Sequence, residues 1–294
     1  MKPEKIRELR ELVVIAIFSD DELMERMVLK GGNALDLIYK LSNRASFDLD
    51  FSISDQFEKT DLPRIEAKLK KTVERVFLQA GYQIFDFNFS ERPHTIAPEV
   101  KDFWGGYAVD FKFIEEAKFK QYENNIEHLR RNAVSIGKKG STKVEIDISK
   151  FEICDQKSEQ ELRSLTIYVY TPEMVAFEKV RALCQQTDSY KQILKTFTPK
   201  PRAKDFYDIH LVMNHYQIDP RSQNNLELIR RIFDAKKVRF SIAELEAKKE
   251  MHRPDFASLP PTLSPEAAKN LLSFDEYFAY LIDTFGHLET LWNE

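Results

Sequence analysis

The chain has 294 residues and a mass of 34.5 kDa, with 43% hydrophobic and 31% charged residues. A chain of this length and composition can bury a large core, which excludes an intrinsically disordered protein. Its 44 Lys and Arg against 48 Asp and Glu give a formal net charge of −4, so only local basic clusters can argue for nucleic-acid binding.

The first thirty residues predict two helices. Apolar side chains at Ile6, Leu9, Val13 and Ile17 recur with helical spacing over residues 3–19, and a second helix is expected over 22–29. The longest apolar run, residues 12–18, is much shorter than the roughly 18 residues that suggest a membrane span. The N-terminus also lacks the features of a signal peptide. We therefore expect a cytoplasmic protein without a membrane partner.

A glycine pair interrupts the helical pattern at residues 30–33. Lys30, Gly31, Gly32 and Asn33 precede a resumed apolar pattern from Ala34, so the glycines open another helix. Backbone N–H groups at such a helix start are unobstructed and face the positive end of the helix dipole, which suits a phosphate. By itself, a glycine pair is usually just a turn.

Residues 47–53 alternate strictly between apolar and polar, which predicts a strand with Asp48, Asp50 and Ser52 on one face. Two aspartates spaced in this way project side by side and can hold divalent cations through oxygen. An isolated Asp-x-Asp is more often solvated surface. Because it follows the glycine pair after one helix, the combination indicates a metal–triphosphate site.

The remainder of the chain divides into a strand-rich part and a helical part. A long helix is expected over 59–80, and strands over 82–89, 108–114, 143–151 and 166–170. The charged segment 115–142 includes an expected exposed loop over 130–141. Helical periodicity then continues over 172–186, 203–215, 226–233, 241–250, 265–272 and 275–291. The predicted class is α+β, with a mixed sheet flanked by helices in a domain 1–170, followed by a helical domain 171–294.

Cysteine and histidine patterns exclude two kinds of site. Cys154 and Cys184 lie in apolar stretches and form no Cys-x-x-Cys pair, which predicts buried free thiols. The six histidines form no His-x-x-x-His pair. A metal here is therefore expected to have oxygen ligands.

The glycine pair, Arg44, Ser46, Asp48 and Asp50 together resemble the first motif of the AbiEii/AbiGii-type toxins. These toxins are a branch of the DNA polymerase beta-like nucleotidyltransferase superfamily. The resemblance implies that Asp48 and Asp50 are metal ligands and that the residues from Lys30 to Asn33, with Arg44 and Ser46, bind the nucleotide. The superfamily usually has Gly-Ser where this chain has Gly31 and Gly32, so a hydroxyl contact to phosphate is missing and Asn33 is a candidate substitute.

Three later segments extend the resemblance, which covers about residues 28–212. Asp147, on the strand expected over 143–151, would be the third metal ligand or a base-like group near the attacking hydroxyl. Lys179, on the helix expected over 172–186, would reach the nucleotide phosphates. In the pattern Arg202-x-x-Asp205-x-x-Asp208, Asp205 would lie nearest the nucleotide and Asp208 would be structural.

The resemblance implies a catalytic toxin of a toxin–antitoxin or abortive-infection system. It would use Mg²⁺, with Mn²⁺ as an alternative, to transfer a nucleotide from a nucleoside triphosphate to an RNA acceptor such as the 3′ end of tRNA, releasing pyrophosphate, and a cognate antitoxin would be its partner. Asp48, Asp50, Asp147 and Lys179 would be its catalytic residues. The alternatives are transfer to a small molecule or a protein hydroxyl, and a non-catalytic nucleotide-binding interaction protein.

Basic clusters could support an RNA acceptor. They occur at residues 130–131, 138–139, 195–204 and 230–239, although such runs are usually solvated faces. Tyr122, Tyr190 and Tyr216 are candidates for stacking at the surface. No short motif identifies the preferred nucleotide, the acceptor, the role of the C-terminal helices or the oligomeric state.

Overall fold

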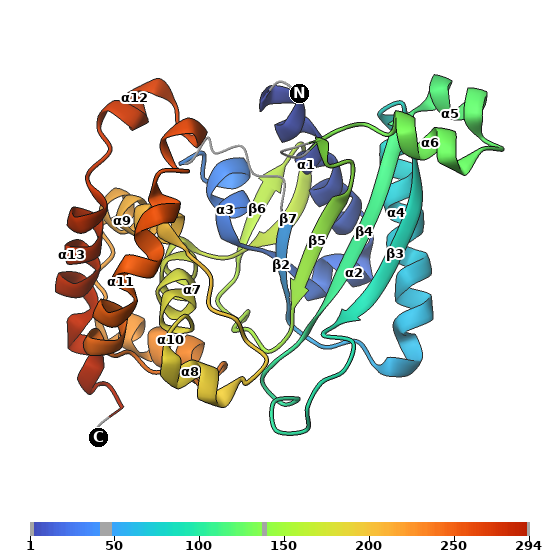
Figure 1. The fold of residues 1–294 in the computed structure, drawn as a ribbon. Helices are drawn as coiled ribbons and strands as arrows, with labels where there is room; N and C mark the ends of the chain where they lie inside the picture. Colours follow the sequence, from blue (N-terminus) through green and yellow to red (C-terminus); the bar gives the residue numbers. More distant parts are fainter. Residues whose placement is uncertain (1–2, 42–48, 137–139, 293–294) are drawn as a thin grey trace.

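A computed structural model describes residues 3–41, 49–136 and 140–292 of the chain (Figure 1). Its strands form one mixed sheet in the spatial order β3-β4-β5-β2-β1-β7-β6. The strands are β1 Met27–Leu29, β2 Leu49–Ile53, β3 Tyr82–Arg92, β4 Gly106–Glu115, β5 Val144–Ser149, β6 Ser158–Leu162 and β7 Leu165–Val169. The pairs β1–β7 and β2–β5 are parallel, and the other neighbours are antiparallel. The expected mixed sheet is thus confirmed.

Helices flank this sheet and then continue alone. Before β7 the helices are α1 Pro3–Phe18, α2 Asp21–Arg26, α3 Gly31–Asn33 with a π-helical continuation Ala34–Ile38, α4 Leu62–Gln79, α5 Glu116–Tyr122 and α6 Ile126–Asn132. After β7 they are α7 Pro172–Cys184, α8 Asp188–Ile193, α9 Ala203–Tyr216, α10 Gln223–Asp234, α11 Ile242–Phe256, α12 Pro265–Lys269 and α13 Phe274–Phe285. Short 3₁₀ helices occupy Lys59–Asp61, Pro260–Thr262 and Gly286–Thr290. Figure 1 shows the later helices gathered on one side of the sheet.

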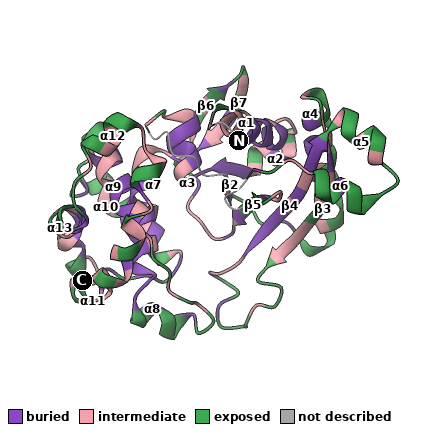
Figure 2. Cartoon of the chain, turned by 45° about the horizontal axis from the view of Figure 1, so that its top comes forward, coloured by how far each residue is buried: buried purple, intermediate pink, exposed green. Residues whose placement is uncertain are grey.

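The core forms where amphipathic helices cover the sheet. On α4, Ile65, Leu69, Val73 and Phe77 recur every fourth residue and are fully buried, which is the stripe that a helix presents to a sheet. The strands at the centre are buried as well, whereas the outward faces of α5, α8 and α12 are exposed (Figure 2). Burial of this apolar stripe, at about 25 cal/mol per Å², stabilises the packing of α4 against β3.

The register of the central strands decides which polar side chains meet. β2 and β5 run parallel, and Asp50 is the register partner of Asp147. β1 lies on the other side of β2 and leads directly into Lys30 and the glycine pair. Asp50 on β2, Asp147 on β5 and the glycine pair after β1 therefore lie in one region of the sheet.

The expectation of a helix over residues 22–29 is wrong at its end. α2 stops at Arg26, and Met27–Leu29 form strand β1, whose residues are all buried. A three-residue apolar strand that is covered on both faces has no alternation, so periodicity cannot separate it from a helix end.

Three further differences concern polar or short elements. Strand β6 and helix α8 were not expected, and Arg130 and Arg131 belong to helix α6 instead of an exposed loop. β6 is an edge strand that pairs only with β7, so its polar sequence carries little strand signal. Asn125 accepts a hydrogen bond from the backbone N–H of His128 and so caps α6.

The helical character of the later chain agrees with the sequence. From residue 172 onward the described residues contain helices and turns but no strand. A division into two domains at residue 170 stays a prediction. Cys154 and Cys184 are both buried and free, as expected. Within the described ranges, no helix combines the length and the apolar character that crossing a membrane requires.

Candidate active site

A cleft of about 1070 Å³ brings together the residues that the motifs singled out. Its walls include Lys30, Gly31, Gly32, Asn33, Asp50, Asp147, Lys179 and Asp205. Among the described lining residues there are eight Lys or Arg and five Asp or Glu. The cleft is therefore positive in a chain whose formal net charge is −4, which favours a polyanionic ligand.

The glycine turn, residues 30–33, lies directly against Asp50. The backbone N–H of Lys30 donates to the Asp50 carbonyl at 3.0 Å. Gly31 has a φ of +66°, and a Cβ added there would lie 3.0 Å from Asp50 Oδ2. The turn thus requires glycine at residue 31, both for its left-handed backbone and for the close approach of the carboxylate.

Asp50 and Asp147 form a pair of carboxylates with different surroundings. Asp147 is 58% exposed, and its Oδ1 lies 3.8 Å from the Arg92 guanidinium. Burial raises the pKa of Asp50 to about 6; Lys30 opposes this shift, whereas Glu178 and Asp147 add to it. An oxygen-preferring divalent cation between the two strands would relieve the mutual repulsion of these carboxylates.

The remaining residues of the first motif cannot be placed beside this pair. Asp48, Arg44 and Ser46 lie outside the described residues. Within the described ranges, no group of three or more His, Cys, Asp or Glu side chains is arranged to hold a metal ion. Asp50 and Asp147 carry carboxylate oxygens of the kind that bind Mg²⁺, so the described part of the predicted ligand set would suit such an ion.

The side chain of Asn33 makes a hydrogen bond within the protein. Its Oδ1 accepts a hydrogen bond from Arg10 Nη1 at 3.0 Å, and the other arm of Arg10 pairs with Asp36. Arg10, Asn33 and Asp36 are each at most 3% exposed. Helix α1 therefore anchors the helix that follows the glycine turn through this buried guanidinium.

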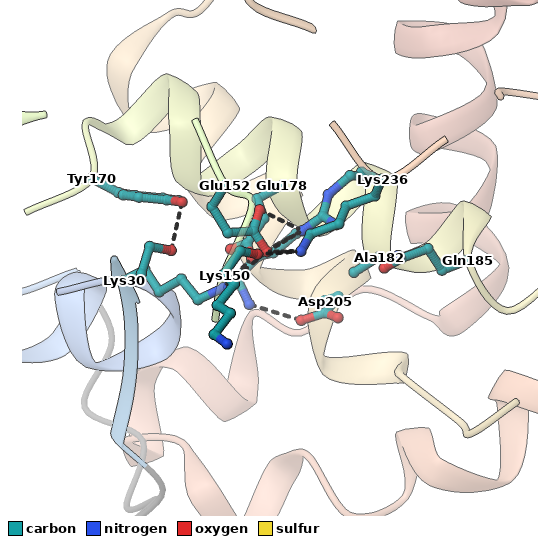
Figure 3. A network of polar contacts seen from close by, with 12 residues as sticks. Lys30, Lys150, Glu152, Tyr170, Glu178, Ala182, Gln185, Asp205 and Lys236 are labelled. Carbon is teal, nitrogen blue, oxygen red and sulfur yellow. Dashed lines mark hydrogen bonds and ion pairs between the residues drawn. The ribbon is translucent and has the colours of Figure 1, made fainter. Parts of the chain in front are cut away.

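A second buried group, here called the Glu152 cluster, joins the sheet to helix α7 (Figure 3). It consists of Lys30, Glu152, Glu178, Arg181 and Lys236. Lys30 Nζ lies 2.7 Å from Glu178 and 3.6 Å from Glu152. Arg181 contacts both carboxylates within 3.3 Å, and Lys236 Nζ lies 3.4 Å from Glu152. The cluster thus holds the residue before the glycine pair against α7.

The close packing of charges in the Glu152 cluster shifts the pKa values of Glu152 and Lys236. Burial opposes the charge of Glu152, but Arg181, Lys30 and Lys236 lower its pKa to about 2. Burial lowers the pKa of Lys236 to about 8, although Glu152 opposes the shift. The cluster contains three basic and two acidic side chains, and all its members line the cleft.

Lys179 lies in a third ion-paired group together with Arg202, Asp205 and Asp208. Its Nζ is 2.7 Å from Asp205 Oδ1 and 2.9 Å from Asp208 Oδ2. Arg202 pairs with the other oxygen of Asp205, and Asp208 is fully buried. Two carboxylates thus hold Lys179 at the cleft wall, and its predicted contact with phosphate stays a prediction.

Helix α11 caps the start of α9, where Asp205 lies. The backbone N–H of Arg202 donates to His252 Nδ1 at 3.0 Å, and that of Ala203 donates to Asp255 Oδ2 at 3.1 Å. His252 is 1% exposed, and burial lowers its pKa to about 4 despite the charges of Asp205 and Asp255, while Arg202 adds to the shift. The C-terminal helices therefore position the Arg202–Asp208 segment.

Sequence reasoning singled out Lys30 and placed Lys236 in the basic cluster 230–239, but it missed Glu152, Glu178, Arg181 and Trp104, which also line the cleft. Glu178 and Arg181 flank Lys179 on α7 at helical spacing, a signal that could have placed them near it. Glu152 and Trp104 lie in irregular segments far apart in the sequence, and no local pattern marks them.

The chain matches a known protein family over most of its length, and solved structures align with it at low identity. Residues 13–280 match the family model described as "Nucleotidyl transferase AbiEii toxin, Type IV TA system". MenT4, a nucleotidyltransferase toxin from Mycobacterium tuberculosis, aligns over 97% of this chain and 83% of its own, with 13% identity and a TM-score of 0.44. An antigenic nucleotidyltransferase-like protein from Paracoccidioides brasiliensis aligns over 94% and 97%, with 16% identity and a TM-score of 0.38. No curated protein matches the chain.

Proposed function

This chain belongs to the AbiEii family of nucleotidyltransferase toxins of type IV toxin–antitoxin systems, and from that premise we propose that it transfers a nucleotide from a nucleoside triphosphate to an RNA acceptor. Membership of the family implies a cognate antitoxin as partner. The observation that carries the proposal is the pairing of Asp50 with Asp147 across parallel strands, beside the glycine turn, in a positively charged cleft.

In the proposed reaction, the chain's own residues mainly position charge. Asp50 and Asp147, with Asp48, would hold Mg²⁺ or Mn²⁺. Such an ion activates an attacking hydroxyl and neutralises a leaving pyrophosphate when it is bound. The N–H groups of Gly31 and Gly32 bind the triphosphate, and Lys179 offsets its charge.

The rim of the cleft supports a polyanionic acceptor. Lys200 and Lys204 line the cleft, and neither side chain has an ion-pair partner among the described residues. Arg92 lines it too and is half exposed. The two lysines without an ion-pair partner suit the phosphates of an RNA strand. We therefore favour an RNA acceptor, such as the 3′ end of tRNA, over a small molecule or a protein hydroxyl.

The test is transfer of label from each of the four α-labelled ribonucleoside triphosphates, with Mg²⁺, into total bacterial tRNA. We expect the wild type to label tRNA and Asp50→Asn to lose that activity. Glu145→Gln is the matched control, because Glu145 lies on β5 two residues before Asp147 and outside the cleft. Label in protein alone would move the acceptor to a protein hydroxyl, and nucleotide binding without any transfer would contradict the proposed activity.

A further inference from the structure

Trp104 is held at the cleft wall by the segment that precedes β4. A Cβ on Gly106 would collide with the carbonyl oxygen of Ile148 on β5, so glycine is what allows this close approach. The Gly105 carbonyl accepts a hydrogen bond from the backbone N–H of Lys150 at 3.0 Å. Trp104 therefore lies beside the strand that carries Asp147, and it lines the same cleft.

Two aromatic side chains, one on α8 and one in the segment after it, pack against Trp104. The ring centroids of Tyr190 and Phe197 lie 6.5 Å and 6.2 Å from the Trp104 ring and 5.7 Å from each other. The prediction that Tyr190 is available for stacking at the surface is wrong, because its side chain is buried and only 2% exposed. Trp104 and Phe197 are half-buried and both line the cleft. Part of a supported aromatic platform is thus open to a ligand.

Gln185 adds an amide next to this platform. It is 7% exposed, lines the cleft and donates from Nε2 to the Tyr190 hydroxyl at 2.9 Å. No donor among the described residues reaches its Oε1. An aromatic face beside a side-chain amide is the combination with which proteins stack a base and read its edge.

The side chains that line the cleft change from basic to aromatic between the glycine turn and Trp104. One oxygen of Glu152 lies 3.6 Å from Lys30 Nζ and 3.4 Å from Lys236 Nζ. Lys236 Nζ in turn lies 5.8 Å from the centroid of the Trp104 ring. From the glycine turn, the wall therefore passes through two cations to an aromatic ring. A nucleoside triphosphate has the same order of groups, from its phosphates to its base.

We propose that Trp104 and Gln185 form the nucleobase subsite of the bound nucleoside triphosphate, with the base stacked on Trp104 and its edge facing Gln185. This inference rests on the proposed function and adds the residues that contact the base. The base belongs to the triphosphate and not to the acceptor, because Lys30 and Lys236 connect the platform to the glycine turn.

Intrinsic fluorescence tests the stacking directly. The chain has two tryptophans, and Trp292 packs on Phe233 outside the cleft, so Trp292→Phe leaves Trp104 as the only reporter. We expect each ribonucleoside triphosphate, with Mg²⁺, to quench Trp104 in a saturable way. Inorganic tripolyphosphate, which has no base, should compete for the site without quenching.

Affinity gives a second, independent readout, measured by equilibrium dialysis with labelled ligands. Trp104→Ala should raise the Kd of the triphosphates about tenfold and leave that of tripolyphosphate unchanged, whereas Trp104→Phe should restore most of the affinity. Gln185→Ala should weaken the four nucleotides unequally, because it removes an edge contact rather than the stack.

The outcomes separate this inference from the proposed function. If the wild type binds no triphosphate, both are overturned. If triphosphates bind but neither quench Trp104 nor lose affinity in Trp104→Ala, only the subsite is overturned. Quenching by tripolyphosphate to the same extent, or by an acceptor oligonucleotide alone, overturns the subsite as well, the latter by assigning the platform to the acceptor.

Discussion

Replacing Gly31 by alanine tests how closely the glycine turn approaches the carboxylate of Asp50. The new Cβ would lie 3.0 Å from Asp50 Oδ2, on a backbone with a φ of +66°. Either the turn or the carboxylate must move. Both movements displace groups that the proposed reaction needs in place, so we expect Gly31→Ala to lose nucleotidyl transfer.

Gly81→Ala separates the two effects of this substitution. Gly81 has a φ of +82°, but nothing lies within 4 Å of a Cβ added there. The Gly81→Ala variant should therefore lose only the stability that a left-handed backbone costs an alanine, about 1–2 kcal/mol. Gly31→Ala carries the same backbone cost plus that of crowding a packed site, about 1–3 kcal/mol, so its total loss should be roughly 2–5 kcal/mol.

Urea unfolding of both variants, together with the transfer assay, measures these quantities. Gly81→Ala should keep wild-type transfer at its lower stability, which shows that backbone strain as such does not abolish activity. A Gly31→Ala variant that equals Gly81→Ala in stability and keeps wild-type transfer would refute the close approach of the glycine turn to Asp50.

Three further predictions concern buried charge, pH and the cleft rim. Glu152→Gln removes a carboxylate shared by three buried cations, and urea unfolding should show a loss of about 3–5 kcal/mol. Because the pKa of His252 falls from 6.5 to about 4 on folding, the unfolded chain binds the proton more readily. Unfolding free energy should therefore fall by up to about 3 kcal/mol as the pH drops from 6.5 to 4. Lys200→Ala combined with Lys204→Ala should weaken acceptor RNA binding and reduce the slope of log Kd against log salt by roughly 1–2.

Each of these predictions has a control. Adding Lys236→Met to Glu152→Gln should recover part of the lost stability, because it removes a buried cation that Glu152→Gln leaves without its carboxylate. No recovery would contradict the ion pair between Lys236 and Glu152. His252→Asn should flatten the acid limb of the stability profile, and an unchanged profile would assign that limb to other groups. Lys70 and Lys71 are exposed on α4, away from the cleft, so the alanine pair there should leave the salt slope unchanged.

Long periodic elements were the predictable part of the fold. The apolar stripe of α4 and the alternating residues of β5 each fit one period over several turns or pairs, so element type followed from the sequence. β1 did not follow, because three buried apolar residues carry no period. β6 did not follow either, because an edge strand tolerates a polar sequence.

In the candidate site, too, some residues could be predicted from local sequence and others could not. Asp50, Asp147 and the glycine turn lie in local motifs, and the structure brings them to one cleft. The Glu152 cluster depends on tertiary contacts among residues from 30 to 236, which no short window contains. The glycine motif includes Lys30 and a basic run includes Lys236, but their membership of one cluster became visible only from the contacts between buried charges.

We propose that Asp50 and Asp147 together carry a metal-dependent nucleotidyl transfer. Pyrophosphate release tests it most directly, measured in the presence of total tRNA over a range of Mg²⁺ and Mn²⁺ concentrations for the wild type, Asp147→Asn and Glu145→Gln. We expect metal-dependent release by the wild type and Glu145→Gln, equal in amount to the nucleotide incorporated, and a loss of release in Asp147→Asn. Equal release by all three proteins, or release that persists after removal of divalent cations, would contradict it.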